Sequence, residues 1–405
     1  MIKKNLPKVR TDLEFIPVLH QGQQLILVRD HLGFVPEGHA LGAPLYQMLA
    51  LLDGSADIRD FQMEMMRRSG GRLVSMDEID RILHYLDKSY LLESGRFQSA
   101  KDKAVRDFSA MDVRPCYHCG QAYPKGPLEL KRRLDEILSG EAILWKPPGK
   151  LRALIAPHID MAAGHRIYSL VYRMLAYTEP ARVILLGIGH RLSRDLFSLT
   201  DKDFDTPLGV VRSDRVPISR LRGVSRDLIA ANDFEHRAEH SIEFQILFLQ
   251  HLLKQDSFKI IPILCGPVSP SLPDYSRKSY VEKAGPLLQG LREILEDSAD
   301  DTLIIAGVDF SHVGPKFGHN MPAEYLQSQS SGHDKKLLEC LSHLDAEGFW
   351  EESSRVKDRF NVCGFAALAC LLEVLGSCTG RLLDYQVWHE EATKSAVGFA
   401  GMVFT

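Results

Sequence analysis

The sequence predicts an α/β protein whose mostly parallel or mixed sheet is covered by helices on both faces, with a smaller domain in front of it. Continuous apolar strands alternate with helical segments between residues 151 and 405. Strands that are buried on both faces read as such unbroken apolar runs. A length of 405 residues also exceeds one typical domain of roughly 100–200 residues. We therefore expect a large α/β domain and a small additional one.

Composition excludes several classes of protein. Hydrophobic residues make up 45% and charged residues 25%, and the net charge is −4. A dominant electrostatic attraction to nucleic acid or to an acidic membrane is therefore not expected. No apolar run reaches the roughly 18–20 residues of a membrane helix, and the N-terminus lacks the apolar core of a secretory signal. Seven mostly scattered cysteines favour reduced thiols and a cytoplasmic location.

Residues 1–95 predict a small winged-helix-like module. "QQLILVRD" (23–30) is typical of a strand, and three helical segments follow it at 43–54, 57–71 and 75–94. Ser75 with Glu78 three residues later predicts a capping box for the third helix. The acidic start of that helix argues against DNA binding. The module resembles the PqqD-like peptide-recognition domains, and this resemblance implies a peptide ligand.

Residues 96–150 are predicted to be a polar connector with a helix near 127–140. It contains "CYHCG", with Cys116 and Cys119. A single C-x-x-C is half a zinc site, and it is also typical of a redox pair. No second C-x-x-C is present, so we favour two ordinary thiols. Both other interpretations stay open.

The large domain is predicted from residues 151–405, where strands and helices alternate. Periodicity places the strands at 151–158, 181–190, 258–266, 301–312 and 395–404, and the helices at 165–177, 240–253, 280–297 and 363–376. About 250 residues are enough for one sizeable hydrophobic core.

Chemically reactive residues follow three of these strands. His158, His190 and His312 stand at strand ends, and Asp309 lies three residues before His312. The carboxyl ends of the strands in such sheets usually border the site. Cys363 opens a helix, where the macrodipole favours the thiolate. Imidazole and thiolate together suit zinc, iron or copper. The pattern therefore predicts a shared metal site, whereas Cys265, Cys340, Cys370 and Cys378 are expected to be packing residues.

A second metal motif competes with this site. His236, Glu239 and His240 spell H-x-x-E-H, the signature of one class of zinc peptidase. The apolar run of the following helix begins only at Ile242, so His236 is expected to precede the helix. The two histidines would then not lie one turn apart, and we regard the match as accidental.

Seven ordered motifs give the large domain a family resemblance. "APHID", "LLGIGHR", "FDTPLGVV", "EHSIEFQ", "VDFSHVG", "NVCG" and "VGFAGMVF" span residues 151–405. In this order they resemble the Memo family, also called AmmeMemoRadiSam system protein B. The resemblance implies a fold similar to that of class III extradiol dioxygenases, which are non-haem iron enzymes.

The resemblance also implies roles for residues. It assigns His158, His190 and Cys363 as metal ligands and His312 as acid/base, with Asp309 beside it. His240 and Glu243 would lie at the rim of the cleft. The sequence departs from the usual pattern at Ile159-Asp160-Met161 and at Ile188-Gly189. Asp160 is therefore expected to be able to add a carboxylate to the site.

We expect a metal-dependent oxidoreductase with Fe(II) or Cu(I), or with zinc. The alternative is a module without catalysis that binds a peptide or sequesters metal. The resemblance implies an unidentified small molecule or peptide as ligand. It also implies radical S-adenosylmethionine and AMMECR-type proteins as partners.

Overall fold

The computed structural model describes residues 5–30, 32–140, 145–193, 195–297 and 301–405. The chain divides into two compact units. Unit 1 ends at Phe108, and unit 2 begins at Ser109. Each unit has its own hydrophobic clusters, so each is described by itself.

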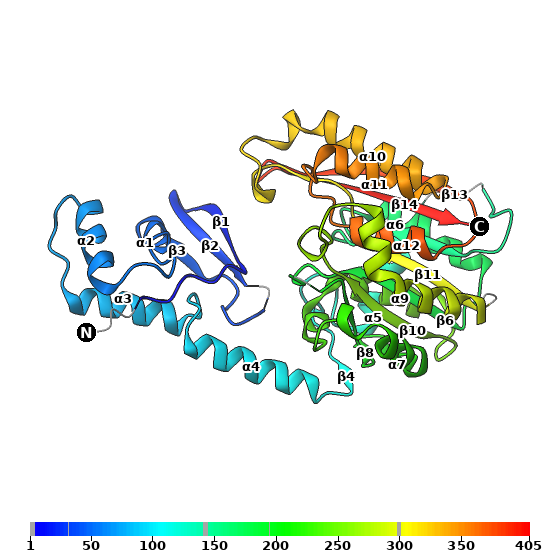
Figure 1. Cartoon of the computed structure of the whole chain (residues 1–405), viewed down its shortest axis with the longest axis horizontal. Coiled ribbons are helices and arrows are strands. Elements are labelled where there is room, and N and C mark those ends of the chain that lie inside the picture. Colours follow the sequence, from blue (N-terminus) through cyan, green and yellow to red (C-terminus); the bar gives the residue numbers. More distant parts are fainter. Residues whose placement is uncertain (1–4, 31, 141–144, 194, 298–300) are drawn as a thin grey trace. The chain divides into compact units, whose positions relative to one another are not determined.

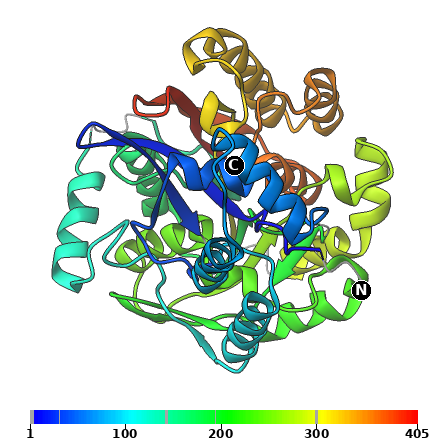
Figure 2. The same ribbon diagram turned by 90° about the vertical axis from the view of Figure 1, so that its left-hand side faces the viewer.

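Unit 1 combines a small antiparallel sheet with short helices. The strand order is β1-β2-β3, and β1 and β2 form a hairpin, blue in Figures 1 and 2. The strand predicted for residues 23–30 is β2, whereas β1 and β3 were not predicted. The elements are β1 (Leu13–His20), β2 (Gln23–Asp30), β3 (Ala40–Gly42), α1 (Ala43–Leu49), α2 (Ile58–Arg68), α3 (Met76–Lys88) and α4 (Gly95–Ser109). A peptide ligand for this unit stays a prediction.

The helix caps of unit 1 differ in part from expectation. The Ser75 side chain accepts a hydrogen bond from the backbone N–H of Glu78 and so caps α3 as predicted. The Glu78 carboxylate binds Arg72 at 2.7 Å, so the reciprocal half of the predicted capping box is not formed. A complete capping box lies instead at the start of α2, between Asp57 and Asp60.

The segment predicted to be a connector contains more structure than expected. Its first part belongs to α4, which buries Phe97 and Phe108 although most of its residues are polar. Charged residues outnumber apolar ones in this helix, and this concealed the helical pattern. The segment also holds β4 (Val113–Arg114) and the predicted helix, α5 (Pro127–Leu138).

Unit 2 is built on an eight-stranded mixed sheet. Its order is β12-β14-β5-β11-β6-β10-β7, with β13 paired to β14. The neighbours from β5 to β10 are parallel, and the outer pairs are antiparallel. The strands are β5 (Ala153–Ala156), β6 (Arg182–Ile188), β7 (Phe197–Leu199), β10 (Lys259–Cys265), β11 (Thr302–Gly307), β12 (His312–Val313), β13 (Gly380–Glu390) and β14 (Ser395–Phe404). This confirms an α/β protein with a mixed, mostly parallel central sheet.

Helices cover both faces of this sheet, and alternate strand residues supply the two cores. Ala153 and Ile155 of β5 join one hydrophobic cluster, whereas Leu154 and Ala156 join the other, as the period of two requires. One face carries α5, α6 (His165–Tyr172) and α8 (His240–Leu252). The other carries α7 (Arg215–Val224), α9 (Arg277–Asp297), α10 (Gln327–Ser342), α11 (Ala346–Val356) and α12 (Phe365–Val374).

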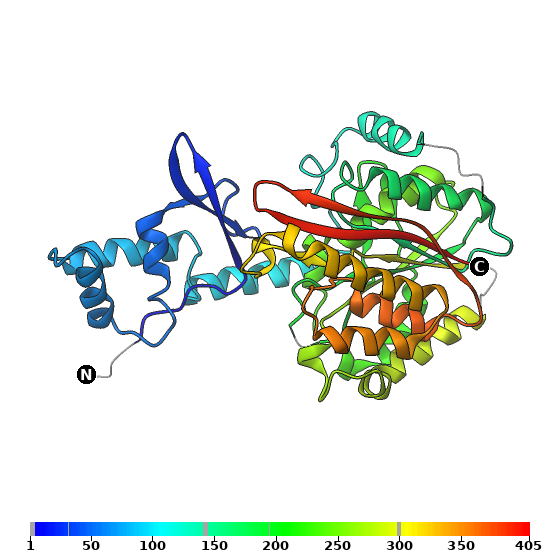
Figure 3. The ribbon, with the colours of Figure 1, turned by 90° about the horizontal axis from the view of Figure 1, so that it is seen from above.

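Two further features complete unit 2. The long hairpin of β13 and β14, red in Figure 3, runs beside α10. A small sheet joins β4 to β8 (Asp203–Thr206) and β9 (Gly209–Val211). Among the described residues, no helix is both long enough and apolar enough to cross a membrane.

Candidate metal centre

The site lies where three neighbouring parallel strands end. The strands β5, β11 and β6 are adjacent in that order. His158 comes two residues after β5, His190 two residues after β6, and Asp309 two residues after β11. Because parallel strands end at one edge of the sheet, these side chains converge there. The ring centroids of His158 and His190 are 5.3 Å apart.

The His158 ring is oriented by a backbone group. Its Nδ1 lies 3.0 Å from the carbonyl oxygen of Gly307, which can only accept a hydrogen bond. Nδ1 therefore carries the proton, and Nε2 presents a lone pair to the site. The backbone N–H of His158 also donates to Asp309 Oδ1 at 3.1 Å. This buried histidine is thus held in the tautomer that a metal ligand needs.

Cys363 lies just before α12, against the end of β11. Gly364 caps the helix, and a Cβ at this glycine would come within 2.6 Å of the Asp309 carbonyl oxygen. The missing side chain thus allows Cys363 Sγ to lie 3.7 Å from His158 Nε2. Burial raises the pKa of the Cys363 thiol well above its usual range, and the charge of Asp309 adds to this effect. The expected thiolate is therefore not the ground state without a metal, because burial outweighs the helix dipole.

Glu239 orients the second histidine. Its Oε2 accepts a hydrogen bond from His190 Nδ1 at 2.9 Å, which leaves His190 Nε2 available. Burial opposes the charge of His190, but the charge and hydrogen bond of Glu239 outweigh it and raise the pKa of His190. The same contact holds the pKa of buried Glu239 well below its usual range.

His240 begins α8 and packs against both predicted histidine ligands. Its ring is stacked on His190 at 5.3 Å and lies edge-on to His158 at 5.1 Å. Burial lowers the pKa of His240 well below its usual range. The helix start is fastened by Ser241 Oγ, which accepts from the backbone N–H of Ile188 at 2.9 Å. His240 is thus a neutral ring inside the cluster.

The proposed acid/base pair lies beside the cluster. Asp309 is buried, with Oδ2 at 3.7 Å from His158 Nε2. His312 opens β12, and its Nδ1 donates to the Phe310 carbonyl oxygen at 2.9 Å, so its Nε2 can accept a proton. Burial lowers the pKa of His312 to about 4, against the opposing charge of Asp309. At neutral pH this ring is therefore a base and not an acid.

Glu243 does not lie at the rim, where the resemblance placed it. Its side chain is completely buried, and Arg114 forms an ion pair with it. It accepts hydrogen bonds from the backbone N–H groups of Tyr117 and His118 at 3.2 and 2.9 Å, and from the Tyr123 hydroxyl. The Arg114 guanidinium overcomes the effect of burial and lowers the pKa of Glu243. Glu243 thus anchors residues 114–123 to α8.

Two other sequence expectations are resolved by the fold. His236 lies in the short 3₁₀ helix Phe234–Ala238 and donates to the Ser198 carbonyl oxygen, apart from the α-helix that starts at His240. The one-turn geometry of a zinc peptidase motif is therefore absent. Asp160 is exposed and accepts from the backbone N–H of Ala162 at 2.8 Å. Among the described residues, Asp160 belongs to neither of the two clusters of side chains that could hold a metal ion.

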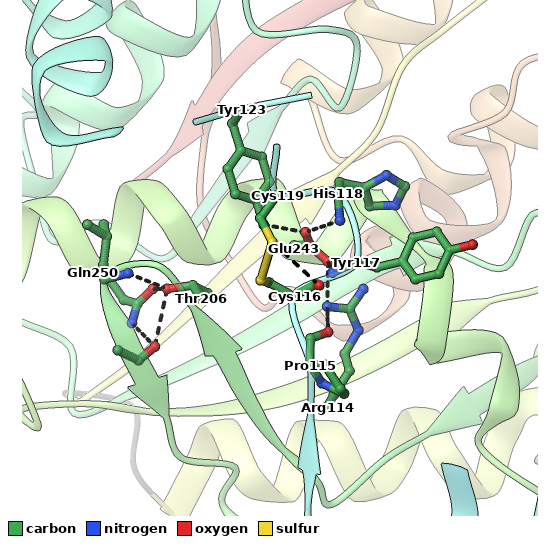
Figure 4. The surroundings of a disulfide bond; sticks show 12 residues. Arg114, Pro115, Cys116, Tyr117, His118, Cys119, Tyr123, Thr206, Glu243 and Gln250 are labelled. Atoms are coloured by element: carbon green, nitrogen blue, oxygen red, sulfur yellow. Dashed lines mark hydrogen bonds and ion pairs between the residues drawn. A yellow bond between two sulfur atoms is a disulfide. The ribbon is translucent and has the colours of Figure 1, made fainter. Parts of the chain in front are cut away.

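The prediction of ordinary thiols at Cys116 and Cys119 is wrong. The two cysteines form a disulfide, shown with its surroundings in Figure 4. The three-residue spacing brings their Cα atoms to 5.8 Å, within the range that a disulfide needs. The five other cysteines are free, as expected.

The donor set fits a metal ion. Among the described residues, ligand atoms of His158, His190 and Cys363 all lie within 4.8 Å of one another, and so do those of His190, Glu239 and His240. Ligand atoms about 2.0–2.3 Å from one tetrahedral ion lie roughly 3.4–3.7 Å apart. The 3.7 Å between Cys363 Sγ and His158 Nε2 matches this spacing. Two nitrogen donors and one sulfur donor leave room for a further ligand.

In the sequence, Glu239 stands out only as part of the H-x-x-E-H motif, although it comes one residue before an apolar helix. In the structure it caps α8 through the backbone N–H of Ser241 and orients His190. An acidic residue at that cap position, beside two metal-site motifs, was the available signal.

Comparisons with known proteins agree with the motif order. The family model described as "Memo-like protein" matches residues 114–403. A MEMO1 family protein of Aquifex aeolicus is 32% identical over 402 residues, covering 98% of this chain and 99% of that protein. A MEMO1 family protein of Thermus thermophilus is 25% identical and covers 85% of this chain and 98% of its own length. One from Methanosarcina barkeri is 27% identical, covering 70% of this chain and 97% of its own length.

The region matched by the family model corresponds to only one of the two units. The family model begins at Arg114, close to the start of unit 2 at Ser109. The archaeal relative leaves about 30% of this chain (100% less the matched 70%) without a counterpart. The part that the family model covers thus lies within the α/β unit, whereas the match to the Aquifex relative covers 98% of this chain. This chain belongs to the Memo-like protein family.

Proposed function

We propose that this chain binds one redox-active metal ion, Fe(II) or Cu(I), through His158, His190 and Cys363 and uses it in an oxidoreductase reaction. The carrying observation is that these three donors converge at the ends of adjacent strands, within 4.8 Å of one another. Bound iron or copper would supply one-electron chemistry with coordination positions that the protein leaves open. A sulfur ligand favours copper over a harder ion.

The residues around the ligands support this role. Gly307 and Glu239 fix the two imidazole rings, so little reorganisation is needed on binding. Asp309 places a carboxylate beside His158, where it balances the positive charge of an ion. His312 is neutral and can accept a proton from a substrate at the same edge of the sheet.

Metal content is the test of the ligand set. Protein purified without oxygen is loaded with Fe(II) or Cu(I), desalted and measured by mass spectrometry. Wild type should hold about one ion per chain, and Cys363→Ser should lose most of it. Cys378→Ser is the matched control, because Cys378 is also half-buried but lies outside both metal groups. Equal metal content in all three proteins would sink the proposal.

A second experiment separates catalysis from metal sequestration. Oxygen uptake by the loaded protein in the presence of a reductant is compared between wild type and His312→Gln. A proton-transfer role predicts a loss on the order of 10²-fold in rate with unchanged metal content. An unchanged rate in His312→Gln would overturn the proton-transfer role of His312, and no oxygen uptake above that of metal-free wild type would favour a sequestering protein without catalysis.

A further inference from the structure

The disulfide between Cys116 and Cys119 has no part in the proposed metal chemistry. Both cysteines are only half-buried, so a reagent in solution can reach them. The bond closes a loop with a sequence separation of three. Such a short loop restricts the unfolded chain less than a long one, so stabilisation is a weak reason for the bond. The C-x-x-C spacing is instead typical of pairs that open and close.

The surrounding segment is held without help from the sulfur atoms. Glu243 accepts from the backbone N–H groups of Tyr117 and His118, which lie between the two cysteines. Figure 4 shows this carboxylate beside the loop, with Arg114 and Tyr123 on either side of it. These contacts join the loop to α8 in either state of the sulfurs. Reduction can therefore open the disulfide while the loop stays in place.

The loop also touches the candidate metal centre. His118 Nε2 donates to the Ala238 carbonyl oxygen at 3.0 Å, and its ring lies 5.6 Å from that of His240. His240 in turn contacts both His158 and His190. A single ring, His240, thus separates the C-x-x-C loop from two predicted ligands. Because His118 stands between the two cysteines, opening their bond can reorient its side chain while Glu243 still holds its backbone N–H.

We propose that Cys116 and Cys119 form a thiol–disulfide exchange site beside the metal centre, and that His118 transmits its redox state to that centre. The partner is a thiol reductant, either a dithiol or two monothiol molecules. Its thiolate attacks Cys116 Sγ, because Cys119 packs against the hydrophobic cluster of α5, α6 and α8. The bond between the cysteine sulfurs breaks, and Cys119 leaves as a thiolate that takes a proton.

The second partner thiol completes the exchange. It attacks the partner's sulfur in the mixed disulfide, and Cys116 is released and protonated. Two electrons and two protons thus pass from the partner to this chain, and the partner becomes a disulfide. The exchange does not depend on the metal. Its coupling to the centre rests on the proposed function.

Equilibration with glutathione tests the exchange. The full chain is incubated in buffers ranging from oxidised to reduced glutathione, quenched with acid and labelled with a maleimide, and added labels are counted by mass. We expect two thiols per chain to appear together across this range. Cys116→Ser and Cys119→Ser should abolish the paired step, whereas Cys378→Ser should keep it. The exchange site would be overturned if Cys116 and Cys119 were reduced by dithiothreitol but not by glutathione, or if they never formed a disulfide in oxidised glutathione.

Zinc affinity tests the coupling, because Zn²⁺ does not itself change oxidation state. We expect the zinc dissociation constant to differ by about tenfold between oxidised and reduced wild type, as for other changes around metal ligands. The double variant Cys116→Ser/Cys119→Ser should show no difference. Reduced Cys116 and Cys119 could themselves bind zinc. Such binding would persist in Cys363→Ser, and the zinc bound by this variant is therefore subtracted from that of wild type.

The outcomes of the two proposals can be told apart. Equal zinc constants in both redox states of wild type would overturn the coupling. If zinc binds in neither state, the coupling is overturned, whereas loading with Fe(II) or Cu(I) decides the metal proposal and the glutathione result decides the exchange site.

Discussion

Each unit of the chain holds a fully buried arginine that is paired with a carboxylate. In unit 1, Arg10 binds Asp30 through two hydrogen bonds of 3.0 and 2.8 Å, and its guanidinium lies 4.0 Å from the centre of the Phe97 ring. In unit 2, Arg114 pairs with Glu243 and donates to the carbonyl oxygens of His236 and Glu239 at 2.6 and 3.1 Å. The same chemistry thus occurs in two settings.

The difference lies in what each pair fastens. Asp30 also accepts hydrogen bonds from three backbone N–H groups of the turn after β2. The Arg10–Asp30 pair therefore connects only segments of unit 1. Arg114 and Glu243 instead join the C-x-x-C loop and the cap of α8, next to the candidate metal centre. A buried ion pair is weak evidence for stability, because desolvation opposes it. The pair in unit 2 therefore matters chiefly for geometry.

The largest expected effect is that of Arg10→Met. It leaves the Asp30 charge buried and should lower the free energy of unfolding of unit 1 by about 3–5 kcal/mol. All three tryptophans, at positions 145, 350 and 388, lie in unit 2. The urea transition by far-UV circular dichroism should shift, while that by tryptophan fluorescence and the metal content stay unchanged. The exposed pair of Arg29 with Glu14 gives the control, Arg29→Met, with a loss below about 1 kcal/mol.

Arg114→Met should destabilise unit 2 by about 3 kcal/mol, the lower end of the range for a broken buried pair. Glu243 keeps three other donors, and Arg114 pairs with one carboxylate, whereas Arg10 pairs with both Asp12 and Asp30. Metal affinity should also fall about tenfold, because Arg114 holds the backbone carbonyl of Glu239, whose carboxylate orients His190. Tryptophan-detected unfolding and metal titration measure the two effects. Arg220→Met, which removes an exposed pair with Glu293, is the control. Unchanged metal affinity would refute the geometric role.

As the pH falls, the free energy of unfolding of unit 2 should begin to decrease at a higher pH than that of unit 1. Burial lowers the pKa of His236 to about 4, and this residue accepts from Arg114 through its carbonyl oxygen. Between pH 6.5 and 4 the unfolded chain binds more protons here than the folded one, so stability falls as the pH falls, by about 3 kcal/mol.

Tryptophan-detected unfolding of wild type and His236→Gln at pH 7 and pH 4 measures this difference. Exposed His343→Gln is the control. In unit 1, Arg10 outweighs burial and lowers the pKa of Asp30, so that contribution is lost only below about pH 4. If wild type and His236→Gln lost the same unfolding free energy between pH 7 and pH 4, His236 would not be the cause of the pH dependence.

The smallest expected effect is that of Tyr123→Phe. It removes one hydrogen bond to Glu243 and should cost about 1–2 kcal/mol in tryptophan-detected unfolding. Because the two backbone N–H donors and Arg114 remain, metal content should not change. Tyr85→Phe removes a hydrogen bond between the hydroxyl of exposed Tyr85 and half-buried His39 in unit 1, and it should cost less, as measured by far-UV circular dichroism. A larger loss in Tyr85→Phe would reverse the comparison.

The sequence by itself determined the α/β class and the three candidate ligands. Apolar runs report burial on both faces of a sheet, and residues after parallel strands meet at one edge whatever the packing of the helices. His158 and His190 therefore lie together as expected, and Cys363, just before α12, joins them. The resemblance placed His240 at the rim of the cleft, whereas its ring packs inside the cluster, stacked on His190.

Only the tertiary structure decided which polar residues serve the site and which serve the fold. Glu239 and Glu243 both flank His240 in sequence, yet one orients His190 and the other is buried against Arg114, more than a hundred residues away. The raised pKa of Cys363 likewise depends on burial and on Asp309, which a local helix rule does not include. Burial and long-range partners are set by packing between distant segments, and a pattern of neighbours along the chain carries no record of them.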